Sequence, residues 1–345
     1  MKRAGGIMTI PTIASRLTSL LGCRHPILCA GMGGPARSEL AAAVCEAGGF
    51  GMLGMVRESP ELIAAEIAET RRRTSRPFAV NLIPAGTKPE LLRAELDVAL
   101  GAKVPAMCFF WDVRPDLIAE AKAAGCKVLY QIGSPEDAFA AEAAGADVII
   151  AQGVEAGGHV RGTLPLAVLL GQLAGKLKVP LVATGGIASG RDMAAALSLG
   201  ADGVQCGTAF LVATESFAHD YHKQRIVQAK AGDTVHTDLF AINWPPNSPV
   251  RVLRNSVVEA AGEKLWGYHP DRLPREVIAH DNGQPMLKFD TNSPLRTTTG
   301  NLEAMALYAG EGAAQITAIR PAKDILEDLM REAAATLTAL AARVG

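Results

Sequence analysis

Short runs of apolar residues alternate along most of the chain with longer segments in which apolar residues recur at helical spacing. A short apolar run next to glycine or proline is typical of a buried strand, whereas apolar residues three or four positions apart are typical of an amphipathic helix. The predicted strands are 26–30, 51–55, 78–83, 106–109, 127–132, 147–151, 180–184 and 203–206. The predicted helices between them are 38–46, 60–73, 89–100, 114–124, 135–144, 164–173 and 190–199.

Three of these helices end in a glycine that is followed within a few residues by the next strand: Gly125, Gly145 and Gly200. Glycine is the usual residue just beyond a helix end because it adopts the left-handed backbone conformation without strain. Eight strands joined by crossover helices predict a (β/α)8 TIM barrel. An open, doubly wound sheet is the structural alternative.

The pattern changes after Thr214. Residues 217–229 are predicted to form the eighth helix, and residues 232–300 are irregular and rich in Pro, Asn, Asp and aromatic side chains. So long a departure is typical of a lid or a small substrate domain. Helix is predicted again over 301–309 and 322–344, with the last helix packing on the outside of the barrel. The predicted organisation is therefore a barrel over 1–229, a lid excursion over 230–300 and C-terminal helices over 301–345.

Composition limits the classes of function. The chain has 345 residues, with 34 Lys and Arg against 35 Asp and Glu, so no overall charge attracts it to nucleic acid or to a membrane surface. Its six cysteines are scattered with no CxxC pair, which favours reduced core thiols and a cytoplasmic protein. We interpret the start of the chain as a short tail and a first helix, not as a signal peptide, and expect no transmembrane segment.

The loop after the sixth predicted strand is the strongest candidate for a functional site. It has the sequence AQGVEAGGHVRG over residues 151–162. Glycine lets the backbone approach a flat or charged ligand closely, and the pair Gly157–Gly158 delivers His159 beside it. Loops at the carboxyl ends of barrel strands are where ligands bind. The pattern predicts a pocket with one titratable side chain.

Three more strand ends carry unusual residues: Asn81 before Pro84, Gly185–Gly186 after the seventh strand, and the segment 205–208 after the eighth. The last two loops are where such barrels commonly hold a phosphate on backbone amides. Neither a Gly-x-Gly-x-x-Gly after the first strand nor a Walker lysine motif is present. A mononucleotide held by its phosphate is favoured over a dinucleotide.

Several segments of the sequence resemble a known family. The segments PILCAGMGG, FAVNLIP, AQGVEAGGHVRG, GGIASGRDMAAALSLGADGVQCGTAF, RVLRN and YAGEGAAQI look like those of nitronate monooxygenases, formerly called 2-nitropropane dioxygenases. The resemblance covers the barrel, and the glycine–histidine loop and the QxGT segment are its most specific parts. FMN-dependent enoyl-acyl-carrier reductases and some NAD(P)H:quinone reductases are related to this family.

The resemblance implies an FMN-binding enzyme that oxidises alkyl nitronates with O2 to carbonyl compounds and nitrite. It places His159 at the catalytic position, where it would abstract the α-proton of a nitroalkane or hydrogen-bond the nitro group of a nitronate. The implied cofactor-binding residues are Ala30, Gly31, Met32, Asn81, Gln131, Gln152, Gly157, Gly158, Gly185, Gly186, Gln205, Cys206, Gly207 and Thr208. Gln152 is expected near the flavin ring, and the glycines and Thr208 near the phosphate. No metal is implied, and a homo-oligomer is compatible with the sequence.

Simpler interpretations stand beside these. Asn81 could cap a turn, Glu155 could only brace the loop, and Cys206 is more typical of a small core residue than of a nucleophile. The pair His219 and His222 lacks further ligands at metal spacing, which favours a solvated helix face.

Competing functions are an NAD(P)H-dependent FMN reductase of an enoyl thioester or quinone, and a flavin- or phosphate-binding barrel without catalysis. An IMP-dehydrogenase-like barrel would need a cysteine nucleophile after the sixth strand, which is absent. The bulky loop 109–112 departs from the resemblance, and residues 243–300 do not align with the family's lid. The substrate and its size are therefore left open.

Overall fold

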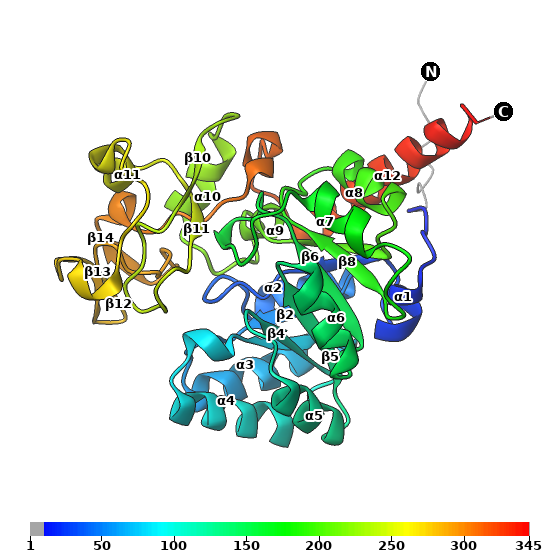
Figure 1. Cartoon of the computed structure of the whole chain (residues 1–345), viewed down its shortest axis with the longest axis horizontal. Coiled ribbons are helices and arrows are strands. Elements are labelled where there is room, and N and C mark those ends of the chain that lie inside the picture. The colour runs from blue at the N-terminus through cyan, green and yellow to red at the C-terminus, as the bar shows by residue number, and fades with distance from the viewer. Residues whose placement is uncertain (1–9, 345) are drawn as a thin grey trace.

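The computed structural model describes residues 10–344, and its centre is a parallel eight-stranded barrel (Figure 1). The strands follow one another around the barrel in the order β1-β9-β8-β6-β5-β4-β3-β2. A parallel bridge between Leu28 and Phe50 joins the two ends of this order. The strands are β1 (Ile27–Cys29), β2 (Met52–Gly54), β3 (Ala79–Leu82), β4 (Ala106–Phe110), β5 (Lys127–Ile132), β6 (Val148–Gln152), β8 (Leu181–Thr184) and β9 (Gly203–Cys206). The predicted TIM barrel is confirmed, and the open-sheet alternative is wrong.

The helices around the barrel form close to their predicted positions, although the short helix at 208–211 was not predicted and the one predicted over 217–229 covers only 220–227. They are α2 (Ser38–Glu46), α3 (Pro60–Arg73), α4 (Pro89–Gly101), α5 (Pro115–Ala123), α6 (Pro135–Ala143), α7 (Leu166–Leu173), α8 (Gly190–Ser198), α9 (Thr208–Leu211) and α10 (Asp220–Val227). The Ser59 side chain caps α3 by accepting a hydrogen bond from the Leu62 amide at 3.2 Å. Gly125, Gly145 and Gly200 have φ of +85°, +103° and +96°, as expected of glycines beyond helix ends.

One end of the barrel is sealed by the first helix, α1 (Arg16–Leu21). Its Leu17 and Leu21 pack in one cluster with Leu28, Phe50 and Met52, which line the inside of the strands. The predicted first helix is therefore confirmed, while residues 1–9 lie outside the described part of the chain. Because this floor is closed by apolar side chains, a ligand must enter from the carboxyl ends of the strands.

The long excursion after the barrel holds two small antiparallel sheets, which lie to one side of the barrel in Figure 1. The first joins β10 (Thr234–Thr237) and β11 (Val250–Leu253) to β7 (Gly158–His159). The second has the order β13-β12-β14, formed by β12 (Val277–Asp281), β13 (Gln284–Leu287) and β14 (Thr298–Gly300). β7 belongs to the glycine–histidine loop, so the excursion is hydrogen-bonded directly to that loop. A helix, α11 (Ser256–Ala261), follows β11.

The helix predicted over 301–309 is wrong. Only a single turn of 3₁₀ helix forms there, η3 (Leu302–Ala304), and the chain then runs extended. The Leu253 amide donates to the Leu307 carbonyl at 2.8 Å, and Tyr308 bridges to Val252. Pairing with β11 replaces the helical hydrogen bonds, which the local sequence favours only weakly.

The C-terminal helix α12 (Ala322–Ala341) lies against α8. The Glu332 carboxylate accepts a hydrogen bond from the Gly190 amide at 2.8 Å and pairs with Arg191. A Cβ at Gly190 would lie 2.5 Å from the Ala333 nitrogen, so the close approach of the two helices requires glycine there.

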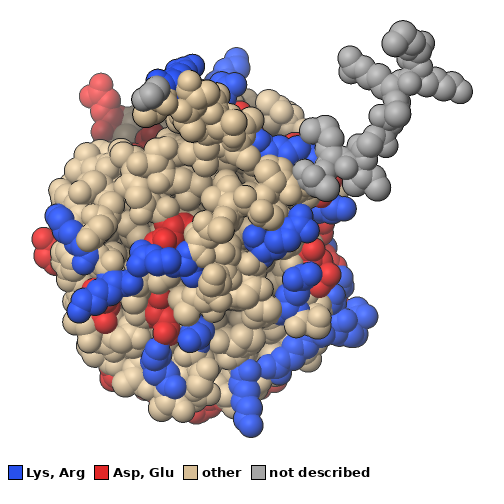
Figure 2. Space-filling model, turned by 90° about the vertical axis from the view of Figure 1, so that its right-hand side faces the viewer, with Lys and Arg blue, Asp and Glu red and all other residues tan. Residues whose placement is uncertain are grey.

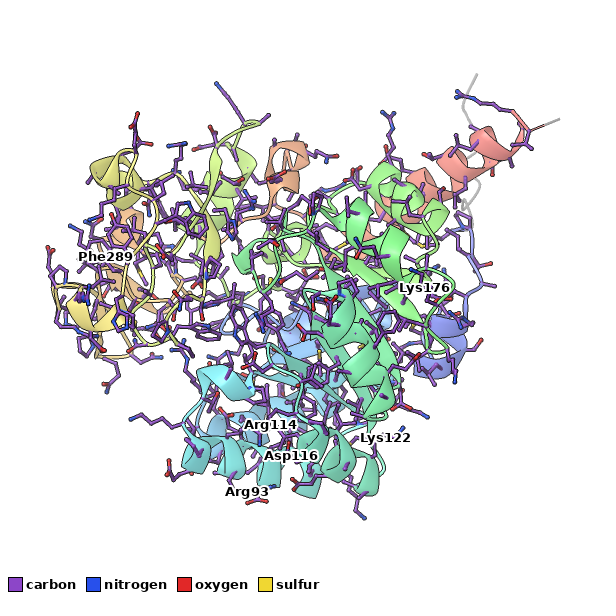
Figure 3. The ribbon with its side chains drawn as sticks, viewed as in Figure 1. Arg93, Arg114, Asp116, Lys122, Lys176 and Phe289 are labelled. Atoms are coloured by element: carbon purple, nitrogen blue, oxygen red, sulfur yellow. The ribbon has the colours of Figure 1, made fainter. Side chains whose placement is uncertain are left out.

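Surface charge follows the balanced composition. Lys and Arg side chains are interspersed with Asp and Glu over the face shown in Figure 2. Many pair locally: Arg114 and Asp116, side by side in Figure 3, form a salt bridge of 2.5 Å at the start of α5. Such exposed pairs each contribute little to stability.

All six cysteines are free. Five are buried and Cys23 is partly exposed, in agreement with the predicted core thiols. Across residues 10–344, no helix combines the length and the apolar character that crossing a membrane requires.

Candidate active site

A cavity of about 640 Å³ opens at the carboxyl ends of the barrel strands. This volume lies within the range of cofactor and small-molecule sites. The predicted site residues that line it are Ala30, Gly31, Met32, Asn81, Gln131, Gln152, Gly157, Gly158, His159, Gly185, Gly186, Gln205, Gly207 and Thr208. The barrel thus brings together residues that are spread over most of its length.

Cys206 differs from the other predicted residues. Its side chain is 1% exposed and belongs to the apolar core between strands and helices. Burial raises the pKa of its thiol to about 12, so the group stays protonated. The simpler interpretation of Cys206 as a core residue therefore holds, and at most its backbone can serve a ligand.

One end of the cavity is formed by backbone amides. Gly185 and Gly186 have φ of +116° and +72°, which glycine alone adopts readily. Within the described residues, the amides of Gly185, Gly186 and Gly207 donate no hydrogen bond to another protein group. Successive free N–H groups in such a turn form a concave site for an anion. This end of the cavity fits a phosphate.

A second glycine loop covers this end and was not predicted as part of the site. Gly310 and Gly312 line the cavity, and the Gly310 amide donates to the Thr208 hydroxyl at 2.9 Å. A Cβ at Gly157 would lie 2.4 Å from the Gly310 nitrogen, so the two loops touch backbone to backbone. The segment YAGEGAAQI carried the signal, since closely spaced glycines indicate tight backbone approach.

Another part of the cavity lining carries side-chain amides. Gln205 donates from Nε2 to Oε1 of Gln131 at 2.8 Å, which leaves Gln205 Oε1 buried without a partner in the described residues. Asn81 donates from Nδ2 to the Cys108 carbonyl at 3.3 Å. A Cβ at Gly31 would lie 2.3 Å from the Asn81 Cβ, so glycine is needed for this contact. Buried polar atoms without partners are rare and mark places where a ligand can complete the hydrogen bonding.

Gln152 lines the cavity, and both ends of its side-chain amide hydrogen-bond the glycine–histidine loop. Its Nε2 donates to the His159 carbonyl at 2.9 Å, and its Oε1 accepts from the Arg161 amide at 3.0 Å. Glu155 braces the same loop by accepting from the Leu166 amide at 3.0 Å. The two hydrogen bonds of Gln152 fix the backbone of His159, and its expected place near the flavin ring stays a prediction.

His159 projects from β7 into the cavity and is enclosed by aromatic rings. Its ring stacks on Trp244 with the centroids 3.7 Å apart, and it meets the edge of Trp111 at 6.2 Å. Its Nε2 is buried without a partner in the described residues. Burial, aided by the positive charge of Arg57, lowers the pKa of His159 to about 3. The imidazole is therefore neutral at any ordinary working pH.

Trp244 comes from the excursion, and the sequence indicated no function for it. It lines the cavity and packs with Ile83, Phe110 and Trp111 in an apolar cluster, which we call the aromatic wall. Its indole Nε1 is buried and lacks a partner among the described residues. Each such group costs about 1–3 kcal/mol when buried, so strong packing must hold the ring in place.

Backbone strain is concentrated around this contact. Arg57, Trp111 and Asn243 have φ of +59°, +91° and +69°. Arg57 donates to the Asn243 carbonyl at 2.7 Å and to the Thr291 hydroxyl at 3.2 Å, and its guanidinium lies over the Trp244 ring. Left-handed conformations of residues other than glycine cost about 1–3 kcal/mol and persist where the surrounding structure enforces them, often at functional sites.

His222 is fully buried and contacts a residue of the cavity lining. The solvated helix face predicted for it is therefore wrong. Its Nε2 lies 3.0 Å from the carbonyl oxygen of Tyr308, a residue that lines the cavity. His219 instead caps α10, where its ring accepts from the Tyr221 amide at 3.0 Å. The alternation of apolar residues around α10 is too weak to show which face is buried. Within residues 10–344, no group of three or more potential ligands could hold a metal ion.

Burial of His222 predicts a loss of stability in acid. Burial lowers its pKa to about 4, while the unfolded chain takes up the proton near pH 6.5. Between these values the unfolded state binds more protons, so stability falls as the pH falls. Lowering the pH from 7 to 5 is expected to cost about 2 kcal/mol through this residue.

Urea unfolding at both pH values tests this effect. His222→Gln, which cannot titrate, should reduce the loss between pH 7 and pH 5 by about 2 kcal/mol relative to the unchanged protein. His280→Gln is the matched control, because that residue is exposed to solvent. An equal pH dependence in all three proteins would contradict the assignment.

Comparisons with known proteins agree with this geometry. The family model for nitronate monooxygenase matches residues 14–332. A nitronate monooxygenase from Pseudomonas aeruginosa is 32% identical, over 93% of this chain and 99% of that protein. The structure of FabK from Thermotoga maritima has a TM-score of 0.82 at 33% identity, covering 96% of this chain and 100% of that one. A nitroalkane oxidase from Streptomyces ansochromogenes has a TM-score of 0.76 at 32% identity, covering 94% and 99%.

Proposed function

Because the chain belongs to the nitronate monooxygenase family, a family of flavin oxidoreductases, we propose that it oxidises alkyl nitronates with O2, using FMN, to carbonyl compounds and nitrite. The observation that carries the proposal is the neutral His159, which faces a cavity that also offers free backbone amides. A mononucleotide would bind at the amides, and its substrate beside the histidine.

The residues present fit FMN. Gly185, Gly186 and Gly207 would hold the phosphate through their free amides, assisted by Thr208. The unpartnered Oε1 of Gln205 would accept a hydrogen bond from the ring system, near Asn81 and Gln131. When bound, FMN supplies the electron transfer between nitronate and O2. The protein would supply binding, orientation and a site shielded from water.

His159 is better suited to bind a nitronate than to deprotonate a nitroalkane. A general base works best when its pKa is near the working pH, and the pKa of His159 is lowered to about 3. A neutral imidazole can nevertheless donate a hydrogen bond to the anionic nitronate oxygen. The site therefore favours the nitronate over the neutral nitroalkane as substrate.

The decisive experiment is anaerobic stopped-flow absorbance of the purified protein, mixed separately with an alkyl nitronate and with NADH or NADPH. We expect the nitronate alone to change the flavin spectrum rapidly, and nitroethane at the same concentration to do so at least about tenfold more slowly, because His159 is a weak base.

Two outcomes would contradict the proposal. Fast bleaching by a pyridine nucleotide, with no response to nitronate, would assign the protein as an FMN reductase of an enoyl thioester or quinone. A bound flavin that responds to none of these compounds would favour a binding protein without catalysis.

A further inference from the structure

We propose that Trp244 determines substrate size by forming a rigid wall that limits the carbon chain of the nitronate beside His159. The inference rests on the proposed function and narrows its substrate class to short-chain nitronates.

The position of the ring makes contact with any substrate unavoidable. The centroids of Trp244 and His159 are 3.7 Å apart, with an angle of 22° between the ring planes. No atom fits between rings at this distance, so a nitronate must reach the histidine along its free edge. A substrate bound there lies next to the indole as well.

The ring is held from several sides. A Cβ at Gly86 would lie 2.6 Å from Cη2 of Trp244, which shows that the chain after β3 packs directly on the indole. The edge of Trp111 meets it at a centroid distance of 6.2 Å, and Arg57 lies 5.3 Å from its centroid. Arg57 also binds the carbonyl of Asn243, the residue that precedes Trp244. Strained residues and an unpartnered indole nitrogen are maintained around this one side chain, so its position is enforced by packing.

The surface beside His159 is apolar and suits a hydrocarbon chain. Ile83, Phe110 and Trp244 line the cavity with apolar atoms, and each is less than 9% exposed. The nitronate group would face His159, and its carbon chain would extend along this wall. In an apolar pocket, one methylene changes discrimination by about tenfold or more. A rigid indole next to the bound nitronate should therefore limit the length of its carbon chain.

The test compares kcat/KM over linear nitronates from ethyl to octyl nitronate, measured with the FMN-loaded protein. In the unchanged protein we expect kcat/KM to fall by at least about tenfold between butyl and octyl nitronate. Trp244→Ala should remove this fall. The ratio of kcat/KM for octyl nitronate to kcat/KM for ethyl nitronate should rise by at least about tenfold. Trp266→Ala is the matched control, because Trp266 is also in the excursion but 50% exposed.

A second variant displaces the Trp244 ring without removing it. Gly86→Ala should push the indole out of position and lower kcat/KM for every nitronate by about tenfold, since its new methyl group would overlap the ring. In the Trp244→Ala background the same change should have no effect. If Trp244→Ala does not fold, Trp244→Leu replaces it, as leucine is smaller but still apolar.

The outcomes separate this inference from the proposed function. An unchanged chain-length profile in the Trp244 variants, with normal nitronate turnover, would overturn the role of Trp244 and leave the function standing. If no nitronate is oxidised, the proposed function fails, and calorimetric titration with linear carboxylates from butanoate to octanoate tests the wall independently. In that case Trp244→Ala should improve the octanoate-to-butanoate affinity ratio by at least about tenfold, and no improvement would overturn the inference.

Discussion

Replacing His159 with alanine is expected to lower kcat/KM for an alkyl nitronate by about 100-fold while leaving the flavin content of the protein unchanged. The variant removes a hydrogen bond to a charged group, which contributes about 1.5–3 kcal/mol in an enclosed site. Flavin content should persist because the free amides of Gly185 and Gly186 belong to a different loop. Steady-state oxygen consumption and the flavin-to-protein absorbance ratio measure the two quantities.

The asparagine variant separates the two possible roles of His159. His159→Asn keeps a hydrogen-bond donor but has no basic nitrogen. If His159 binds the nitronate, His159→Asn should retain nitronate turnover to within about tenfold. If His159 removes a proton from the substrate, His159→Asn should lower the turnover of nitroethane by about 100-fold or more and leave nitronate turnover unchanged. Full turnover of both compounds by both variants would show that His159 has no catalytic role.

Replacing Gly157 with alanine is expected to weaken FMN binding by about 100-fold. A Cβ at this position would lie 2.4 Å from the Gly310 nitrogen and 2.5 Å from the Ala309 carbonyl carbon, both of which are backbone atoms. Backbone cannot rotate away as a flexible side chain does, so the segment 308–312 must move. That segment lines the cavity through Gly310 and Gly312, and Gly312 packs against Gly186, one of the residues proposed to hold the phosphate. Overpacking of this kind costs about 3 kcal/mol.

The neighbouring glycine provides the control. Gly158 has φ of +77°, and a Cβ there would meet nothing within 4 Å. Gly158→Ala should therefore add backbone strain of about 1–2 kcal/mol but leave the segment 308–312 in place, and it should weaken FMN binding less than Gly157→Ala does. Fluorescence titration of the flavin-free proteins with FMN measures the FMN affinity of both variants. Equal affinities for the two variants would show that the contact between Gly157 and Gly310 does not shape the phosphate site.

The sequence by itself determined the barrel and most of the residues around its mouth. Apolar runs, helical periodicity and terminal glycines depend on near neighbours along the chain, and the strands and helices of residues 26–206 formed where these signals indicated. Parallel strands bring their carboxyl ends to one rim, so Asn81, Gln152, Gly186 and Thr208 were predicted to meet and do line one cavity. Their roles toward FMN, like the division of the chain at residues 229 and 300, stay predictions.

Only the tertiary structure decided what surrounds His159. Trp244, Arg57 and Tyr308 reach the cavity through contacts between segments far apart in the chain, such as the bond from Arg57 to Asn243. The segment 305–309 took an extended form instead of a helix because β11 offered it hydrogen-bond partners. Local patterns describe which residues can be buried or turned, but partners across the chain are chosen by packing and hydrogen-bond satisfaction once the elements meet. For this reason the residues at the barrel rim were predictable, and the aromatic residues around His159 were not.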